Sequence, residues 1–492
     1  MKNYKKLLGS ISIVTFSYAA SRILGFAREI LLAKWAGVSS ATDTLDLAFI
    51  IPDFLFYLSA GGYLAITLIP LLSNKKEEEL TEYFLSLLYG LSVVFVSVSL
   101  ITFLFRNQFA NFLEVESPDF FIEIFTPIIF SQTFFFIGAI LMAFQYFKDQ
   151  FLYAAAAPVI YNATIILFGW LNSTSPENTI RGFAVGTLVG SILGHLVVQI
   201  IGVKKSGLKF KLVSPRVKDL KEYLLISLPL VIGQSIAVVD EQLFRIFGSL
   251  LSVGTVATFR YARRIALLPV GIVAQAVGVA SYPLLARLYK NNEIEELILL
   301  IKKQISYLFL VSGSLMLVGI LNSNLIVKVV YERGAFTSVD TNRVATVFSI
   351  IVLAVIPWSL NQIVTRSFYV QQKFWFPVLW GSIVTLLTSL VLVSISKSAV
   401  NYSSTIVISL FVYFVILIFT LKFNETPVLD SFLIFDLLKM SLVFYITYLV
   451  SNKFITEATF LSFGVSLISV STLIFVSLKL LKFEYINIAK RR

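Results

Sequence analysis

Long apolar segments recur along the whole chain and are separated by short polar stretches. A helix needs roughly 20 apolar residues to cross the hydrocarbon core of a bilayer. The pattern predicts helices at 8–35, 41–72, 80–104, 120–147, 150–171, 180–203, 220–250, 254–289, 297–322, 341–372, 374–395, 402–422, 430–450 and 456–481. No polar stretch between them is longer than a loop. We therefore expect an all-α integral membrane protein of about fourteen transmembrane helices.

The longest polar loop suggests how these helices are grouped. The expected divisions are an N-terminal lobe of six helices over 1–204, a linker loop over 205–219, a C-terminal lobe of six helices over 220–422, and a last helix pair with a basic tail over 423–492. Similar segments end the second and eighth helices, Ile69-Pro70-Leu71-Leu72 and Tyr282-Pro283-Leu284-Leu285. Either these are common membrane dipeptides that match by coincidence, or the chain is a two-lobed transporter with internal repeats.

Composition and charge agree with a membrane protein and set its orientation. Only 14% of residues are charged, whereas soluble domains contain about a quarter. The net charge of +12 does not indicate nucleic-acid binding, because the basic residues are spread over short loops. Most of them fall on one side if the helices alternate, and the positive-inside rule makes that side cytoplasmic. Both termini and the 205–219 loop are therefore expected in the cytoplasm.

Few residue types that perform catalysis or bind metals are present. The chain has no cysteine and one histidine, so we expect no disulfide, thiolate nucleophile or zinc site. His195 lies in an apolar stretch, where packing is favoured over proton transfer. The loops on the outer side are too short to carry the catalytic acids of a membrane glycosyltransferase or polymerase. We therefore expect a transporter that uses no cofactor.

Arginines lie deep in the predicted helices. Arg22 and Arg28 are in the first helix, and Arg263 and Arg264 are in the eighth. Each would cost about 3 kcal/mol at the centre of a bilayer, so they must face water, acids or a ligand.

Two interpretations of these charges compete. In one, Arg22 pairs with Glu29, Arg245 pairs with Glu241, and Asp43 caps the second helix. In the other, a water-filled cavity presents guanidinium groups to a diphosphate, which a forked donor binds well. We favour the second interpretation for the arginines and leave Asp43 open.

Several motifs resemble the MurJ (MviN) lipid II flippase family of the multidrug/oligosaccharidyl-lipid/polysaccharide exporter superfamily. They are Ser21-Arg22-Ile23-Leu24-Gly25-Phe26-Ala27-Arg28 with Ala41-Thr42-Asp43 and Pro52, Tyr261-Ala262-Arg263-Arg264 with Pro269, Glu332-Arg333-Gly334-Ala335-Phe336-Thr337 with Asp340, and Arg366-Ser367-Phe368-Tyr369 with Pro377.

The resemblance implies alternating access in the bacterial cytoplasmic membrane and flipping of lipid II, a polyprenyl-linked glycan lipid. It also implies that the last two helices form a groove for the polyprenyl tail. It carries Arg22, Arg28, Asp43 and Arg264 over as substrate-site residues. We add Arg263, which stands where the family often has an acid, as a further candidate. We expect a monomer that contacts membrane lipids.

The sequence departs from the family pattern at several positions. The family usually has two arginines after Pro52, where this chain has Phe56 and Tyr57. Some members are thought to bind sodium, and Asp240 resembles the ligand on the seventh helix, so Asp240 and Glu241 are candidates for ion coupling. Transport of another polyprenyl-linked glycan is the main alternative. A multidrug cation antiporter and a membrane scaffold that transports nothing are further alternatives.

Overall fold

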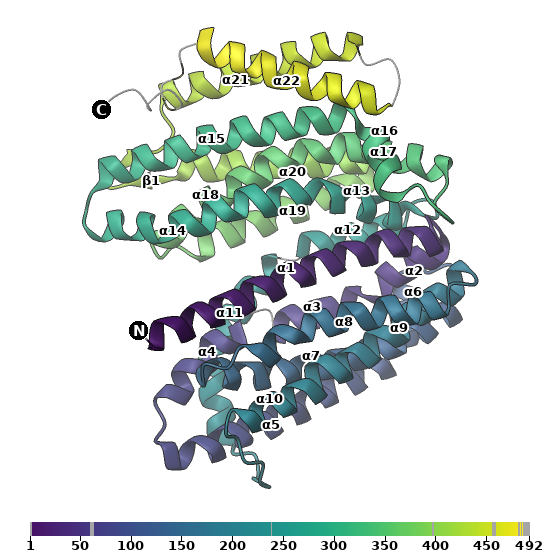
Figure 1. Cartoon of the computed structure of the whole chain (residues 1–492), viewed down its shortest axis with the longest axis vertical. Coiled ribbons are helices and arrows are strands. Elements are labelled where there is room, and N and C mark those ends of the chain that lie inside the picture. Colours follow the sequence, from purple (N-terminus) through teal and green to yellow (C-terminus); the bar gives the residue numbers. More distant parts are fainter. Residues whose placement is uncertain are drawn as a thin grey trace. The chain divides into compact units, whose positions relative to one another are not determined.

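The computed structural model describes all residues except 1, 60–62, 238, 396–397, 455–458, 481–482, 484 and 486–492. The described chain is almost entirely helical (Figure 1). Its contacts divide it into two compact units, which we describe separately. The first unit contains Met1–Ala257 and Arg333–Phe336, and the second contains Thr258–Glu332 and Thr337–Arg492.

The first unit contains the N-terminal helices. They are α1 (Lys2–Ala36), α2 (Ser40–Ala48), α3 (Ile50–Ser59), α4 (Tyr63–Ser73), α5 (Glu77–Leu104), α6 (Arg106–Phe112), α7 (Pro118–Phe147), α8 (Leu152–Leu171), α9 (Pro176–Ser191), the π-helical turn η1 (Ile192–Val197), α10 (Val198–Lys205), α11 (Val217–Ala237) and α12 (Val239–Ser249). The first residues of α13 (Thr255–Pro269) also belong to it.

The second unit begins within α13. It continues with the π-helical turn η2 (Val270–Ala274), α14 (Gln275–Lys290), α15 (Ile294–Leu321), α16 (Ser323–Tyr331), α17 (Ser338–Ile351), the 3-10 turn η3 (Val352–Ala354), α18 (Val355–Val370), α19 (Trp375–Ile395), α20 (Ala399–Thr420), strands β1 (Lys422–Phe423) and β2 (Thr426–Pro427), α21 (Ser431–Phe454) and α22 (Phe460–Leu480).

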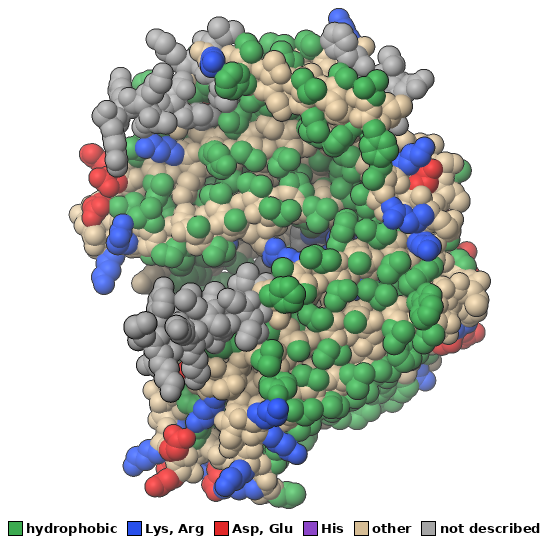
Figure 2. All heavy atoms as spheres, in the orientation of Figure 1, with side chains coloured by type: hydrophobic (Ala, Val, Ile, Leu, Met, Phe, Trp, Pro, Cys, Tyr) green, Lys and Arg blue, Asp and Glu red, His purple; other side chains and the backbone are tan. Residues whose placement is uncertain are grey.

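The structure agrees with a membrane protein. Each predicted segment is helical over most of its described length, with non-helical residues at some ends and at breaks such as Phe49. Within the described residues, nine helices are long and apolar enough to span a bilayer, and Trp375–Thr388 and Phe460–Val476 are shorter apolar helices. Figure 2 shows hydrophobic side chains spread over the flanks of the helices. Large hydrophobic side chains such as Val93, Leu104 and Trp170 are exposed, as expected of a protein whose surface faces lipid.

Some elements differ from the expected single helices. The predicted helix 41–72 consists of α2, α3 and α4, and the predicted helix 220–250 consists of α11 and α12. The hairpin of β1 and β2 was not expected. It forms because Asn424 and Glu425 adopt positive φ angles of 45° and 66°, the conformation that a two-residue hairpin turn requires.

Helix α7 lies at the centre of the first unit, where it packs against α4, α5 and α9. Phe84 of α5 and Phe144 of α7 are buried, with ring centroids 4.6 Å apart. On another side, Gly138 of α7 meets η1, because a Cβ at this glycine would lie only 2.4 Å from the carbonyl oxygen of His195.

The packing boundary between the units differs from the expected boundary between the lobes. The lobe expected over 220–422 stays a prediction, and in the division by contacts α11 and α12 group with the first unit. The physical reason is that α11 packs against α3, α4 and α5. Leu220 of α11 fits against Gly90 of α5, where a Cβ would lie 2.8 Å from the Leu220 side chain.

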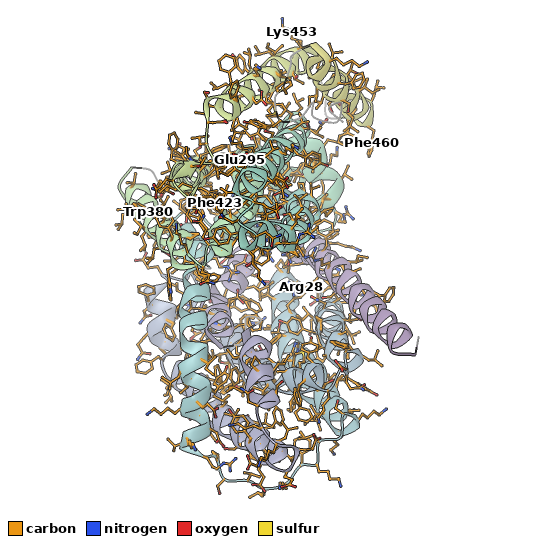
Figure 3. All side chains as sticks on the ribbon, turned by 90° about the vertical axis from the view of Figure 1, so that its left-hand side faces the viewer. Arg28, Glu295, Trp380, Phe423, Lys453 and Phe460 are labelled. Atoms are coloured by element: carbon orange, nitrogen blue, oxygen red, sulfur yellow. The ribbon has the colours of Figure 1, made fainter. Side chains whose placement is uncertain are left out.

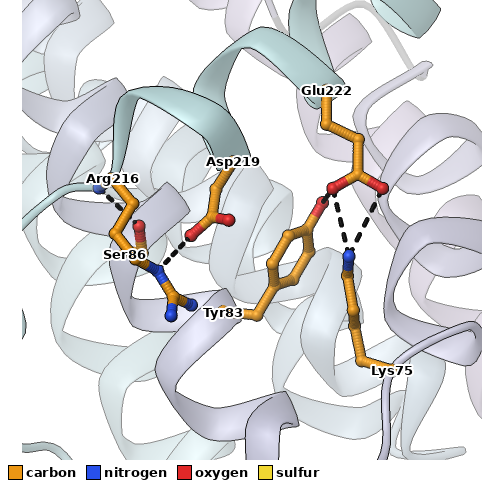
Figure 4. A network of polar contacts seen from close by, with 6 residues as sticks. All are labelled: Lys75, Tyr83, Ser86, Arg216, Asp219 and Glu222. Carbon is orange, nitrogen blue, oxygen red and sulfur yellow. Dashed lines mark hydrogen bonds and ion pairs between the residues drawn. The ribbon is translucent and has the colours of Figure 1, made fainter.

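Polar contacts fasten the linker and the start of α11 to the first unit (Figure 4). Glu222 accepts hydrogen bonds from Lys75, at 3.1 Å, and from the hydroxyl of Tyr83, at 3.1 Å. The backbone N–H of Arg216 donates to the hydroxyl of Ser86 at 2.8 Å. The linker is therefore held along α5 in an extended conformation.

In the second unit, α21 and α22 pack against each other and against α15. The carboxylate of Asp430, just before α21, accepts hydrogen bonds from Lys302 of α15 at 2.5 Å and from the hydroxyl of Tyr485 at 2.9 Å. The backbone N–H of Tyr485 donates to Asp436 at 3.2 Å. Tyr485 is thereby fastened to the beginning of α21, and we call these contacts the C-terminal anchor.

Candidate substrate site

The guanidinium group of Arg28 lies in the first unit, on α1 (Figure 3). Its Nη1 donates to Oδ1 of Asn162 on α8 at 3.2 Å, and its Nη2 pairs with Oε1 of Glu29 at 3.1 Å. The side chain of Arg28 is 23% exposed and that of Glu29 is 5% exposed. These contacts use two of the five N–H donors of the guanidinium, so its other donors can bind an anion on the exposed side.

Arg22 lies on α1 as well and is exposed. The sequence suggests an ion pair between Arg22 and Glu29, and this pair stays a prediction. Glu29 forms an ion pair with its neighbour Arg28. A substrate role for Arg22 stays a prediction.

The carboxylate of Asp43 caps a helix far away in the sequence. Its two oxygens accept hydrogen bonds from the backbone N–H groups of Gly254, at 2.6 Å, and Ala257, at 2.7 Å, which lie at the beginning of α13. Ser39 caps α2 instead, through a 3.3 Å bond from the N–H of Thr42. A negative charge is favourable at a helix N-terminus, so Asp43 links α2 to α13.

A second ion pair lies within the first unit. Arg245 of α12 pairs with Asp53 of α3 at 2.8 Å. The side chain of Glu241, which the sequence suggests as a partner of Arg245, lies outside the described part of the structure. Asp53 was not predicted as an ion-pair partner. Its position directly after Pro52, within an apolar segment, could have indicated a paired acidic residue.

Aromatic rings lie beside these charges. The ring of Phe56, one helical turn after Asp53, is 5.8 Å from that of Phe135 on α7. Phe135 is in turn 4.8 Å from Tyr161 on α8. Tyr161 directly precedes Asn162, which accepts the hydrogen bond from Arg28. Charged and aromatic groups from α1, α3, α7 and α8 thus converge in the first unit.

The arginines of α13 lie in the second unit. The guanidinium of Arg263 lies 5.8 Å from the ring centroid of Trp358, a cation–π distance. Arg264 is exposed. That Arg264 shares one cavity with Arg22 and Arg28 stays a prediction.

The family model described as Lipid II flippase MurJ matches residues 32–477. The chain belongs to the MurJ lipid II flippase family. Among its relatives, a probable lipid II flippase MurJ of Rhizobium tropici is 27% identical over 401 residues, which cover 75% of this chain and 72% of that protein. A probable lipid II flippase MurJ of Buchnera aphidicola subsp. Baizongia pistaciae is 28% identical over 435 residues, with 83% and 81% covered.

Solved structures place the fold in the same group. The structure of a lipid II flippase MurJ in an inward closed conformation matches with a TM-score of 0.79 and 20% identity, covering 95% of this chain and 98% of that one. An inward-facing multidrug resistance MATE family transporter of the MOP superfamily matches with a TM-score of 0.59 and 13% identity, covering 86% and 95%. The chain thus has the all-α transporter fold of MurJ.

The sodium ligands suggested by the resemblance to MurJ are not tested. Asp240 and Glu241 lie on α12, but their side chains lie outside the described part of the structure. On α19, the hydroxyls of Ser382 and Thr385 donate to backbone carbonyls of their own helix, at 2.9 Å and 2.8 Å. The described residues contain no group of three or more His, Cys, Asp or Glu side chains suited to a metal.

Proposed function

We propose that this chain flips lipid II from the cytoplasmic to the outer leaflet of the bacterial cytoplasmic membrane. Membership of the MurJ family supports the substrate class. The observation that carries the proposal is the half-buried guanidinium of Arg28, which Asn162 and Glu29 hold in place while part of it stays exposed. A planar group with several N–H donors is well suited to bind a diphosphate.

In this proposal the arginines attract the headgroup, and the protein alternates between inward-open and outward-open states. Arg22 and Arg28 contribute from the first unit, Arg263 and Arg264 contribute from the second, and Asp43 acts through the start of α13. With both termini cytoplasmic, an inside-negative potential favours outward movement of the anionic headgroup by about 2.3 kcal/mol per charge and 100 mV. No ATP is required.

Two finer points belong to the same proposal. A single chain carries out transport, and Asp240 with Glu241 is the candidate site for a coupling sodium ion. Flipping measured in proteoliposomes with sodium or with potassium tests the second point. A flipping rate that is the same in sodium and in potassium would contradict coupling to sodium.

The test of function uses a strain depleted of its own lipid II flippase, together with flipping measured in vesicles. The chain should restore growth and flip lipid II. Arg28→Ala should lower the apparent affinity or the flipping rate roughly 10- to 100-fold, because a hydrogen bond to a charged group contributes about 1.5–3 kcal/mol. Arg181→Ala is the matched control, because Arg181 forms an exposed pair with Glu123, and such pairs contribute little.

The outcomes separate the alternatives. Failure of the unaltered chain to rescue growth or to flip lipid II, despite normal membrane expression, would contradict the proposal. Loss of a surface polysaccharide on deletion in the native host would then favour another polyprenyl-linked glycan. Equal activity of Arg28→Ala and Arg181→Ala would remove Arg28 from the site.

A further inference from the structure

We infer that Phe56, Phe135 and Tyr161 form a platform in the first unit on which a sugar ring of the transported headgroup stacks. This inference rests on the proposed function, because it assigns part of the same site to the glycan. We call these three residues the aromatic platform.

The three rings contact one another in sequence. Phe135 lies in the middle, with its ring 5.8 Å from Phe56 and 4.8 Å from Tyr161, and both pairs meet edge to face at 76°. Such pairs fix the orientation of each ring, because the positive edge of one ring lies against the negative face of the other. A fixed ring loses little freedom when it binds a ligand.

Neighbouring positions on α7 show that the platform differs from the hydrophobic core. Phe125, Phe136 and Phe144 of the same helix are buried, with 0% to 2% of their surface exposed. Phe135 is only partly buried, as are Phe56 and Tyr161. Phe56 and Tyr161 also pack against the hydrophobic core, but part of each ring remains exposed.

The ring of Phe135 packs against that of His195, which is buried. The ring of His195 lies 4.1 Å from that of Phe135, and His195 is only 5% exposed. Its Nδ1 has no hydrogen-bond partner in the described part of the chain. Gly138 permits this contact, since a Cβ there would collide with the His195 backbone. His195 therefore acts as a positioning residue behind Phe135.

Groups that can bind hydroxyls and phosphates lie next to the platform. The carboxylate of Asp53 is one helical turn from Phe56 and 30% exposed. The buried amide of Asn162, which follows Tyr161 in the sequence, is bonded to Arg28 and to the carbonyl of Pro158 and so holds Arg28 beside the platform. A pyranose has an apolar C–H face and a rim of hydroxyls, so an aromatic surface bordered by acceptors matches it. The guanidinium of Arg28 beside the platform matches the diphosphate attached to that sugar.

The test compares two lipids that differ only in the glycan, using the full chain in nanodiscs. Lipid II carries the sugars, and undecaprenyl diphosphate does not. Phe56→Leu and Phe135→Leu should weaken lipid II binding about three- to tenfold, in line with the energy of aromatic pairs. They should leave binding of undecaprenyl diphosphate unchanged. Arg28→Ala should weaken the binding of both lipids.

Matched variants separate stacking from folding. Phe56→Tyr keeps the ring and should retain lipid II binding. Phe95→Leu removes a ring that stacks on Phe136 with centroids 3.4 Å apart, away from the charged groups, and should change neither affinity. Equal weakening of the binding of both lipids by Phe56→Leu and Phe135→Leu, or no change in either, would contradict sugar stacking on the aromatic platform. The same effect of Phe95→Leu and Phe56→Leu would also contradict it. Failure of the unaltered chain to bind lipid II would instead overturn the proposed function.

Discussion

At the scale of single residues, the carboxylate of Asp43 connects segments that are more than 200 positions apart in the sequence. It accepts hydrogen bonds from two backbone N–H groups at the beginning of α13, which have no partner within that helix. Its charge also interacts favourably with the dipole of that helix. One side chain therefore fixes both the start of α13 and the position of α2.

Asp43→Ala should lower the free energy of unfolding by roughly 0.5–2 kcal/mol, because the cap of α13 is lost. Hydrogen exchange at the amides of Gly254 and Ala257 should accelerate. Asp43→Asn keeps one neutral acceptor and should give a smaller change in both measurements. Exchange at these amides that is the same in all three proteins would contradict the cap.

The sequence identified Arg28 as a site candidate but did not identify its partners. The cost of a charge in lipid depends only on the residue and its depth, and both can be read from the sequence. The contact with Asn162 depends on how α1 and α8 are rotated against each other, and a single sequence does not contain that angle. For the same reason Asp53 was missed as the partner of Arg245.

At the scale of helices and loops, the C-terminal anchor joins the beginning of α21 to Tyr485. Partial burial raises the pKa of Asp430, but hydrogen bonds from Lys302, the Leu433 amide and Tyr485 lower it more, so the net pKa is below the ordinary value. A carboxyl group with a lowered pKa in the folded state stabilises that state above its ordinary pKa. The stabilisation is lost as the pH falls through the lowered value.

We therefore expect the C-terminal anchor to weaken below about pH 4, the ordinary range of an Asp carboxyl. Hydrogen exchange at the amide of Tyr485, relative to the intrinsic rate at each pH, should increase as the protein is acidified. Asp430→Asn should show increased exchange at neutral pH and little further change in acid. Glu425→Gln, which alters an exposed ion pair with Lys422, should behave like the unaltered chain, and a response equal to that of Asp430→Asn would argue against a specific anchor.

Helix positions were predictable and helix interruptions were not. The apolar runs located each span, because burial in lipid requires about 20 apolar residues whatever the packing. The break between α2 and α3 falls at Phe49, between the apolar residues Ala48 and Ile50. Such breaks depend on contacts with neighbouring helices, which override local preference.

At the scale of the whole molecule, the orientation in the membrane can be tested directly because the chain has no cysteine. Ser214 is exposed in the linker, and Thr174 is exposed in the loop between α8 and α9. With cytoplasmic termini, Thr174→Cys should react with an impermeant maleimide in spheroplasts. Ser214→Cys should react only after permeabilisation. The reverse pattern would invert the proposed topology.

The packing of α11 and α12 also bears on the origin of the chain. If the two six-helix lobes arose by gene duplication and fusion, they no longer coincide with the two compact units of the structure. A fragment that ended at residue 204 would lack α11, which covers parts of α3, α4 and α5. The groove at Gly90, which fits Leu220, would be left open. The first half of the chain therefore relies on α11, which follows the linker, to complete its packing.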